Sequence, residues 1–167
     1  MQANWQGKAF AAAMLDVRVH DEDTCDIATP FVGGLAVEDG STSGTVQLIT
    51  AAKNNTAYRK ALVTARNMQI VAMNITPADG DQIPPETHRA TTQTLLVVDG
   101  TAKVVIQKGD EIVVHTVQPL ESITIAPGTR HSIVSTNAER PLKLLSFYAP
   151  VEHRYDTIEE RRRVAEQ

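Results

Sequence analysis

The sequence predicts a single all-β domain, a sandwich or barrel built from short antiparallel strands. Three observations lead to this fold class. Short segments rich in β-branched and apolar residues follow one another through the second half of the chain. Turn dipeptides such as Asp99-Gly100 and Pro127-Gly128 separate these segments. The length of 167 residues suits one domain with a full hydrophobic core.

The strand pattern begins after Gly44 and continues to Tyr148. We expect strands at 46–49, 58–64, 69–75, 93–98, 102–107, 112–117, 122–125, 132–135 and 142–148. Proline, glycine, asparagine and aspartate lie between them, and these residues favour tight antiparallel connections. The segment 94–98 is apolar on both faces, so a second sheet or a homodimer partner is expected to cover its outer face.

Both ends of the chain are expected to lie outside the barrel, which spans residues 55–153. Residues 1–54 are predicted to form an irregular arm with a short helix near 7–19, where alanines favour a helix and larger apolar residues recur near helical spacing. This arm should pack on the barrel exterior or on a partner subunit. Residues 154–167 are predicted to form a C-terminal helix, because 157–160 has the pattern of a capping box.

Composition narrows the possible partners and location. The net charge is -4, the pI is about 5.7, and basic residues are mostly scattered, which argues against nucleic-acid binding. The single cysteine, Cys25, excludes an internal disulfide framework, and a cytoplasmic location is the simpler interpretation. No apolar run is long enough to span a membrane, and the short segment 9–15 does not have the features of a secretory signal.

Four polar side chains in this pattern can converge on one centre. Glu86 and His88 are separated by one residue, so on an extended segment they project from the same face. A hairpin after His88 would return Gln93 toward this pair. A proline–glycine turn delivers His131 at the start of a predicted strand. We therefore expect all four side chains to point at one position inside the barrel.

These residues resemble the two motifs of the cupin superfamily, small metal-binding β barrels. In the first motif, two histidine places, a carboxylate place and a glycine place are taken by Glu86, His88, Gln93 and Gly100. Glu86 and Gln93 depart from the general motif. The second motif resembles the set Pro127, Gly128, His131 and Asn137, with somewhat different spacing around the histidine.

A narrower resemblance is to small cupins of the mannose-6-phosphate-isomerase-like type, which carry the pattern E-x-H-x-x-x-x-Q here. The similarity extends to 55–64 and 140–150. It implies a single-domain cupin, a double-stranded β-helix or jelly-roll barrel, often a homodimer, and a metal held by the set Glu86, His88, Gln93 and His131. Imidazole and oxygen donors suit divalent manganese, iron, cobalt, nickel or zinc. A barrel that has lost its metal is the alternative.

The function expected from this site is metal-dependent chemistry on a small oxygenated metabolite, with a sugar or sugar acid as first candidate. Isomerisation or a related proton transfer fits a Lewis-acidic ion. An iron-dependent oxygenase and a non-catalytic ligand-binding cupin stay open as alternatives. Tyr148 is the candidate catalytic proton donor, although a packed tyrosine with a hydrogen-bonded tip explains it more simply. Glu152 and His153 are interpreted as the end of the fold.

Overall fold

The computed structural model describes residues 46–80, 82–137 and 139–162. Its elements in chain order are α2 (Leu48–Asn54), β1 (Arg59–Ala65), β2 (Met68–Ile75), the 3-10 turn η1 (Pro77–Asp79), β3 (Gln82–Thr87), β4 (Thr92–Asp99), β5 (Ala102–Lys108), β6 (Glu111–Val117), β7 (Ser122–Ile125), β8 (Arg130–Ser135), β9 (Leu142–Ala149) and β10 (Ile158–Glu159).

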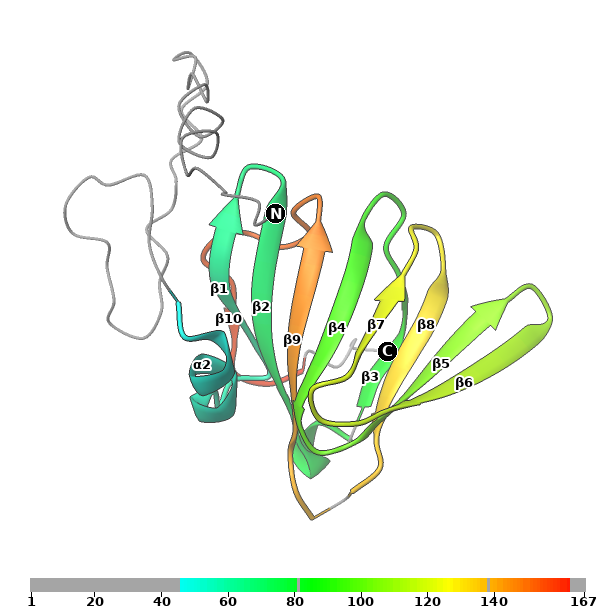
Figure 1. The fold of residues 1–167 in the computed structure, drawn as a ribbon, viewed down its shortest axis with the longest axis horizontal. Helices are drawn as coiled ribbons and strands as arrows, with labels where there is room; N and C mark the ends of the chain where they lie inside the picture. Colours follow the sequence, from blue (N-terminus) through cyan, green and yellow to red (C-terminus); the bar gives the residue numbers. More distant parts are fainter. Residues whose placement is uncertain (1–45, 81, 138, 163–167) are drawn as a thin grey trace, which may run out of the picture.

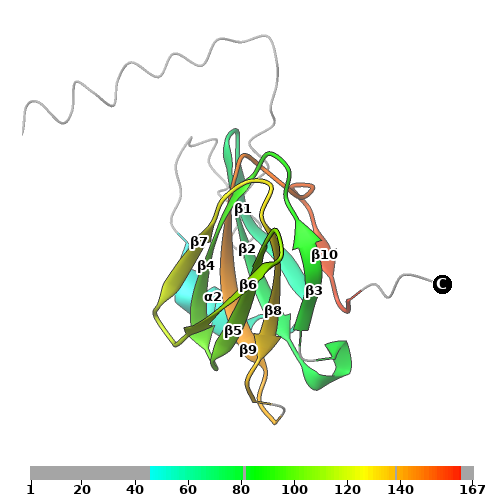
Figure 2. The same cartoon turned by 90° about the vertical axis from the view of Figure 1, so that its right-hand side faces the viewer.

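Two antiparallel sheets make up the fold. A six-stranded sheet has the order β10-β1-β2-β9-β4-β7, and a four-stranded sheet has the order β3-β8-β5-β6. Figure 1 shows the β5–β6 hairpin extending away from the larger sheet, and Figure 2 shows the strands of the smaller sheet lying over those of the larger one. The predicted all-β class is confirmed as a predominantly β-sheet fold. None of the helices in the described part of the chain is long and apolar enough to cross a membrane.

Every strand predicted after residue 55 is found, with ends that differ by at most two residues. The prediction at 46–49 is wrong, because helix α2 begins at Leu48. The hairpin predicted between 88 and 93 is also wrong. Strands β3 and β4 belong to different sheets, so residues 88–91 connect the two layers instead of reversing within one.

The hydrophobic core lies between the two sheets. Alternating residues on β9 and β2 supply its centre, including Leu142, Leu144, Val71 and Met73, all fully buried. The smaller sheet contributes Ile133 and further apolar side chains from its inner face. Period-two alternation therefore holds on the inner face of both layers, as expected for packed antiparallel sheets.

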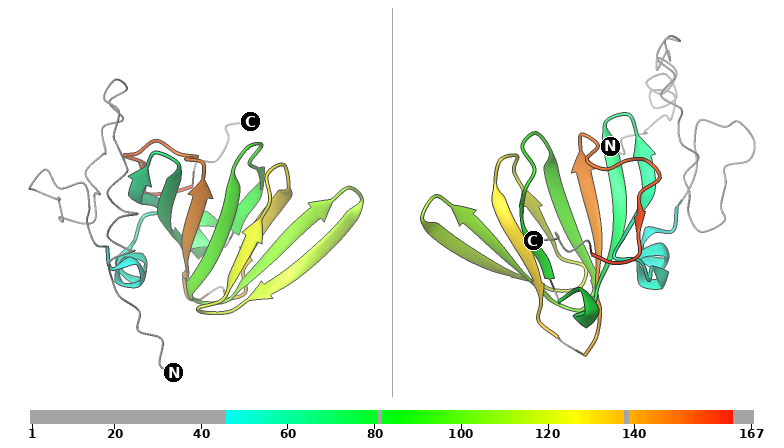
Figure 3. Two further views of the ribbon diagram at one scale, coloured as in Figure 1. Left: turned by 45° about the horizontal axis from the view of Figure 1, so that its top comes forward. Right: turned by 180° about the vertical axis from the view of Figure 1, so that it is seen from behind.

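The outer face of the larger sheet carries a second apolar cluster, and α2 lies on it. Ala52 of α2 is fully buried in this cluster, and Val98 and Leu145 of the sheet belong to it as well. Figure 3 shows the cyan helix on the outside of the sheet. The doubly apolar β4 thus has its outer face covered partly by a helix of its own chain. The helix expected at 7–19 lies outside the described residues, and the homodimer stays a prediction.

The C-terminal helix predicted for 154–167 is wrong over residues 154–162. Ile158 and Glu159 instead form β10, which pairs with Lys60 and Arg59 of β1. Thr157 hydrogen-bonds through its hydroxyl to the carbonyl of Arg154, 2.8 Å away, so it closes a local turn and does not cap a helix. Edge pairing with β1 and the β1 ion pair Arg59–Glu159, at 2.9 Å, override the local helix signal.

The conformation of Gly100 explains why the first motif has a glycine at this place. Its φ is +84°, and a Cβ there would lie 3.3 Å from Cδ1 of Leu142 and 3.4 Å from the Leu142 Cα. A side chain at this position would therefore be both strained and crowded against the core. The glycine forms part of the turn that connects β4 of the larger sheet to β5 of the smaller sheet.

Candidate metal centre

Strands β3 and β8 bring the first two candidate ligands together. Glu86 and His131 are direct cross-strand partners in the β3–β8 ladder. The register shifts between Ile83 and Glu86, which is the irregularity that a β-bulge produces next to many sites. His88 lies just beyond the end of β3, two residues after Glu86, and its side chain is buried on the same side.

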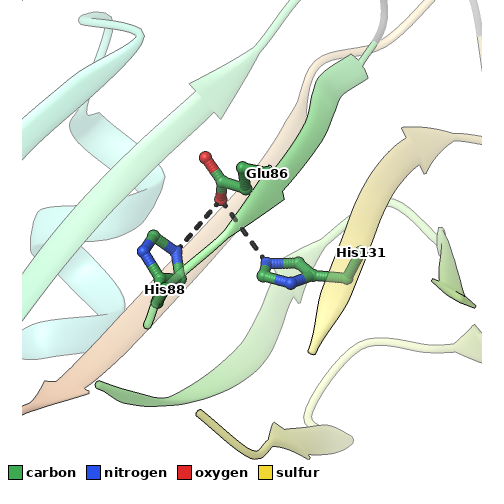
Figure 4. A group of neighbouring side chains, drawn as sticks. All are labelled: Glu86, His88 and His131. Atoms are coloured by element: carbon green, nitrogen blue, oxygen red, sulfur yellow. Dashed lines mark ion pairs between the residues drawn. The ribbon is translucent and has the colours of Figure 1, made fainter. Parts of the chain in front are cut away.

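Glu86 lies between the two imidazoles (Figure 4). Its Oε1 atom is 3.4 Å from Nε2 of His88 and 3.5 Å from Nε2 of His131. One donor atom from each of the three residues lies within 4.8 Å of the others, and among the described residues this trio could hold a metal ion. The convergence predicted for Glu86, His88 and His131 is therefore present.

Each imidazole turns its second nitrogen toward a supporting group. Nδ1 of His88 lies 2.9 Å from Oε1 of Glu152. Nδ1 of His131 lies 3.0 Å from the carbonyl oxygen of Thr129. Metal-bound histidines almost always use the outer ring nitrogen in this way, which fixes the ring and leaves the other nitrogen for the ion.

The charges of the site depend on one another. Burial alone raises the pKa of the Glu86 carboxyl, but the imidazoles of His131 and His88 outweigh burial and lower it to about 2. The Glu86 carboxylate raises the pKa of His88 against the opposing effect of burial, and Glu152 adds to the rise. Burial likewise raises the pKa of Glu152, yet the Thr91 hydroxyl and His88 lower it overall. The two carboxylates are thus ionised.

Gln93 reaches the interior from the other sheet. It is fully buried on β4, and its Nε2 donates to Oγ of Ser146 at 2.9 Å and to the hydroxyl of Tyr148 at 3.0 Å. Its Oε1 is buried with no hydrogen-bond partner among the described residues. The same is true of Nε2 in His88 and in His131. Buried polar atoms normally have well-formed hydrogen bonds, so these three atoms need an explanation.

Tyr148 lies on β9, directly opposite Gln93 of β4 in the larger sheet. It is fully buried, and its ring packs edge-on against His88 with centroids 5.4 Å apart. On another side it meets the imidazole of His153 at 5.0 Å. Burial raises the pKa of the Tyr148 hydroxyl above its ordinary value, and the Glu86 charge adds to the rise. The hydroxyl therefore stays protonated at neutral pH.

Two residues that support the candidate site were not assigned to it from the sequence. Glu152, interpreted as the end of the fold, contacts a candidate ligand directly. Gln69, fully buried on β2, holds the backbone beside Glu152 through hydrogen bonds to His153. A hydrophilic residue among apolar neighbours on β2 is the sequence signal for Gln69, and Asn74 on the same strand gives the same signal. The adjacent pair Glu152-His153 gives no periodicity that would show its direction.

Comparisons with known proteins agree with this architecture. A family model described as "Cupin domain" matches residues 73–148. The crystal structure of BH2720 from Bacillus halodurans is 33% identical, with a TM-score of 0.67, and the match covers 74% of this chain and 92% of that chain.

Two further relatives are more distant or longer. "Uncharacterized protein YrkC" of Bacillus subtilis (strain 168) is 31% identical over 117 residues, which is 69% of this chain and 61% of that protein. The chain thus spans 61% of the length of this curated relative. An uncharacterized conserved protein with a double-stranded beta-helix domain from Klebsiella pneumoniae subsp. pneumoniae MGH 78578 is 17% identical, with a TM-score of 0.52 and coverage of 65% of this chain and 91% of that chain. The last likeness concerns the fold alone.

Proposed function

This chain belongs to the cupin family, and from this premise we propose a metal-dependent cupin that acts on a sugar or sugar acid by isomerisation or a related proton transfer. One observation carries the proposal. Nε2 of His88, Nε2 of His131 and Oε1 of Gln93 are all buried without a well-formed hydrogen bond among the described residues, and the two nitrogens have the Glu86 carboxylate at 3.4 and 3.5 Å. With the Glu86 carboxylate between the imidazoles, they offer two nitrogens and two oxygens.

The donor set fits a divalent transition metal. Neutral imidazole and oxygen donors suit manganese, iron, cobalt, nickel or zinc, and no thiolate is among the four residues. Each imidazole already has its outer nitrogen engaged, which leaves Nε2 for the ion. Gln93 would serve as a neutral ligand from the facing sheet. Glu86 would then be the only anionic ligand, so a divalent ion would keep about one net positive charge.

When bound, such an ion supplies Lewis acidity toward a substrate oxygen. The chain's own residues then decide where protons move. The hydroxyl of Tyr148 accepts a hydrogen bond from Gln93 and keeps its own proton, because burial raises its pKa. We assign Tyr148 the role of proton donor to the substrate oxygen, with solvent water taking the proton released from carbon and returning it when the product forms. The Gln93 amide orients this hydroxyl, which couples the ligand and the proton donor through one side chain.

A non-catalytic ligand-binding cupin is the second candidate, and one observation favours it. The groups nearest the site that could accept a proton from carbon are already engaged or poorly basic. Glu152 is paired with His88, and burial together with Arg59 lowers the pKa of His153 to about 4. A base matched to neutral pH is therefore absent from the described residues around the site.

The test has two steps. Elemental analysis of purified protein identifies the retained metal. The loaded protein is then incubated in D2O with a panel of sugars and sugar acids, and proton NMR follows deuterium entry at the carbon next to the carbonyl. We expect metal-dependent exchange with at least one compound, since proton transfer through solvent leaves this record.

Three variants sharpen the result. Glu86→Gln removes the anionic ligand and should abolish exchange, and Tyr148→Phe should slow it. His115→Gln, on exposed β6, is the control that should keep it. A compound that raises the melting temperature of the loaded protein without exchange would favour the non-catalytic candidate. Protein that retains none of these metals and binds none on titration would overturn the proposal.

A further inference from the structure

The segment that joins β9 to β10, residues 150–157, carries Glu152 to the metal centre. We call this segment the strap. Figure 3 shows it in orange and red, running from the end of β9 toward β10 beside β1. We propose that Gln69 and the strap position His88 through Glu152, so that strap closure and metal binding stabilise each other. This inference rests on the proposed metal centre and adds a positioning residue that contacts none of its ligands.

Gln69 holds the strap through its backbone. The N–H of His153 donates to Oε1 of Gln69 at 2.9 Å, and Nε2 of Gln69 donates to the carbonyl of His153 at 2.9 Å. Nε2 also lies 3.0 Å from Oγ1 of Thr64 and 3.3 Å from the carbonyl of Arg154. One buried amide thus satisfies both backbone groups of one residue, much as a neighbouring strand would.

These hydrogen bonds between Gln69 and the backbone of His153, which we call the clamp, restrict the position of the preceding residue, Glu152. Glu152 is largely outside the core, with 28% of its side chain exposed, and has no strand to hold it. Gln69 locks the next peptide and the Thr91 hydroxyl contacts the carboxylate, so Glu152 is kept 2.9 Å from Nδ1 of His88. The imidazole of His153 packs against Tyr148 at 5.0 Å and anchors the same segment from its other side.

The two histidines are supported differently, and the difference makes the strap matter. His131 is supported by the carbonyl of Thr129, two residues away on its own chain segment. His88 lies beyond the end of β3 and is supported by Glu152, which is distant in sequence. The orientation of His88 therefore depends on a segment distant in sequence, and a metal ion that binds the oriented imidazole must in turn stabilise the strap that orients it.

The first experiment measures metal affinity by calorimetry for paired variants. Gln69→Leu removes the clamp, and Asn74→Leu is the matched control. Asn74 is a buried amide on the same strand that holds the carbonyl of Thr56 at 3.0 Å, away from the strap. We expect Gln69→Leu to weaken metal binding about 10-fold and Asn74→Leu to leave it unchanged, although both lose stability. Positioning partners of metal-bound histidines typically account for 10- to 100-fold in affinity.

A second pair tests Glu152 itself. Glu152→Ala should weaken metal binding by about 10- to 100-fold, and Glu152→Gln should recover part of the loss because an amide oxygen can still accept from Nδ1. Glu121→Ala is the control, since its exposed carboxylate accepts only the local backbone N–H of Gln118 at 2.8 Å. Equal affinities in Gln69→Leu and Asn74→Leu, or in Glu152→Ala and Glu121→Ala, would overturn the inference.

Two readouts need no activity. Metal should slow amide hydrogen exchange of His153 in the wild type, by the same factor that strap closure strengthens metal binding. In metal-free protein, proton NMR should report a downfield Nδ1–H of His88 held in the 2.9 Å contact with Glu152, and Gln69→Leu should lose this signal. A wild type that binds no metal refutes the proposed function, whereas an unchanged His88 signal in metal-free Gln69→Leu refutes the positioning role by itself.

Discussion

Glu86 and His131 face each other as cross-strand partners, and Oε1 of Glu86 lies 3.5 Å from Nε2 of His131. Paired residues on one face of an antiparallel ladder have their Cβ atoms about 5 Å apart, so this contact is built into the register of β3 and β8. The β3–β8 ladder therefore fixes the relative positions of Glu86 and His131. His88 lies beyond the end of β3, and the ladder does not fix its position.

Loss of the His131 imidazole should greatly weaken metal binding. His131→Gln keeps the approximate size of the side chain but removes Nε2 as a ligand, so we expect metal affinity to fall by more than about 100-fold. Calorimetric titration of chelator-treated protein measures this. The exposed His115 on β6 gives the control His115→Gln, which should bind metal as the wild type does. Similar affinities in the two variants would contradict a role for His131 as a ligand.

Tyr148→Phe separates packing from proton transfer. The ring stays in contact with His88 and His153, but Gln93 loses the hydroxyl that accepts its hydrogen bond at 3.0 Å. We expect a stability loss of about 1 kcal/mol, little change in metal affinity, and a fall in turnover of about 100-fold or more if the hydroxyl donates a proton. Urea unfolding and the NMR exchange assay measure the two effects. Unchanged turnover would assign Tyr148 to packing alone.

Helix α2 should contribute to stability through the outer face of the sheet. Ala52 is fully buried there, so Ala52→Glu would place a charge in an apolar cluster that includes Leu145. We expect the unfolding free energy to fall by about 2 kcal/mol or more. Lys53→Glu, at the exposed neighbouring position, should change it by less than about 0.5 kcal/mol. Equal effects in urea unfolding would show that α2 does not pack on the sheet in solution.

His153 should make the fold sensitive to acid. Burial and the Arg59 guanidinium lower its pKa to about 4. In the unfolded chain a histidine binds a proton below about pH 6.5, so between these values the unfolded state binds more protons and stability falls as pH falls. The charged and titratable groups around the imidazole are Arg59 on β1, Glu86 on β3, Tyr148 on β9, Glu152 beside it and Glu159 on β10.

The comparison of wild type with His153→Leu isolates this effect. Because the imidazole is only partly buried, we expect about 1 kcal/mol from the shift after allowing for solvent screening. Between about pH 7 and pH 4.5 the wild type should lose about 1 kcal/mol more unfolding free energy than the variant. His115→Leu controls for the loss of an exposed histidine. The same pH slope in wild type and His153→Leu would rule out a neutral, buried His153.

The sequence carries enough information for strands β1, β2 and β4 to β9 and for three of the candidate ligands, because these depend on local period, parity and turn residues, whereas β3 and β10 were not predicted. Glu86 and His88 lie two residues apart, and that spacing alone puts them on one side of an extended segment. The path from His88 to Gln93 is different. A four-residue connection looks the same whether it returns within a sheet or crosses to the other one, so the predicted hairpin had no local signal against it.

Tertiary pairing also explains the two errors at the ends. Residues 157–160 have a capping-box pattern, yet Ile158 and Glu159 gain backbone pairing and an ion pair with β1. Of the strand predicted at 46–49, residues 48 and 49 instead begin α2, where Leu48 packs on the apolar cluster of the outer face. The secondary structure of such short segments depends on the surface against which they pack, and sequence periodicity does not show that surface. Glu152 belongs to the same class, because Gln69 and not its own neighbours sets its position.

Gln93→Glu is the sharpest test of the ligand set. The fourth ligand would change from neutral to anionic at nearly the same shape, and the hydroxyls of Ser146 and Tyr148 can each turn to donate to the new carboxylate. Metal-free protein should lose stability, since a second buried carboxylate would join Glu86. Metal affinity should rise by about 10-fold or more, and metal at ~100 times its dissociation constant adds ~2.7 kcal/mol to the folded state.

The melting temperatures of metal-free and metal-loaded Gln93→Glu should therefore lie further apart than those of the wild type. Turnover should fall at the same time, because a second carboxylate offsets the net positive charge that makes the ion a Lewis acid. Gln107→Glu, at the exposed end of β5, adds the same charge elsewhere and should change neither property. Equal or weaker metal affinity in Gln93→Glu would show that Gln93 does not bind the ion, and its unpartnered oxygen would then need another ligand.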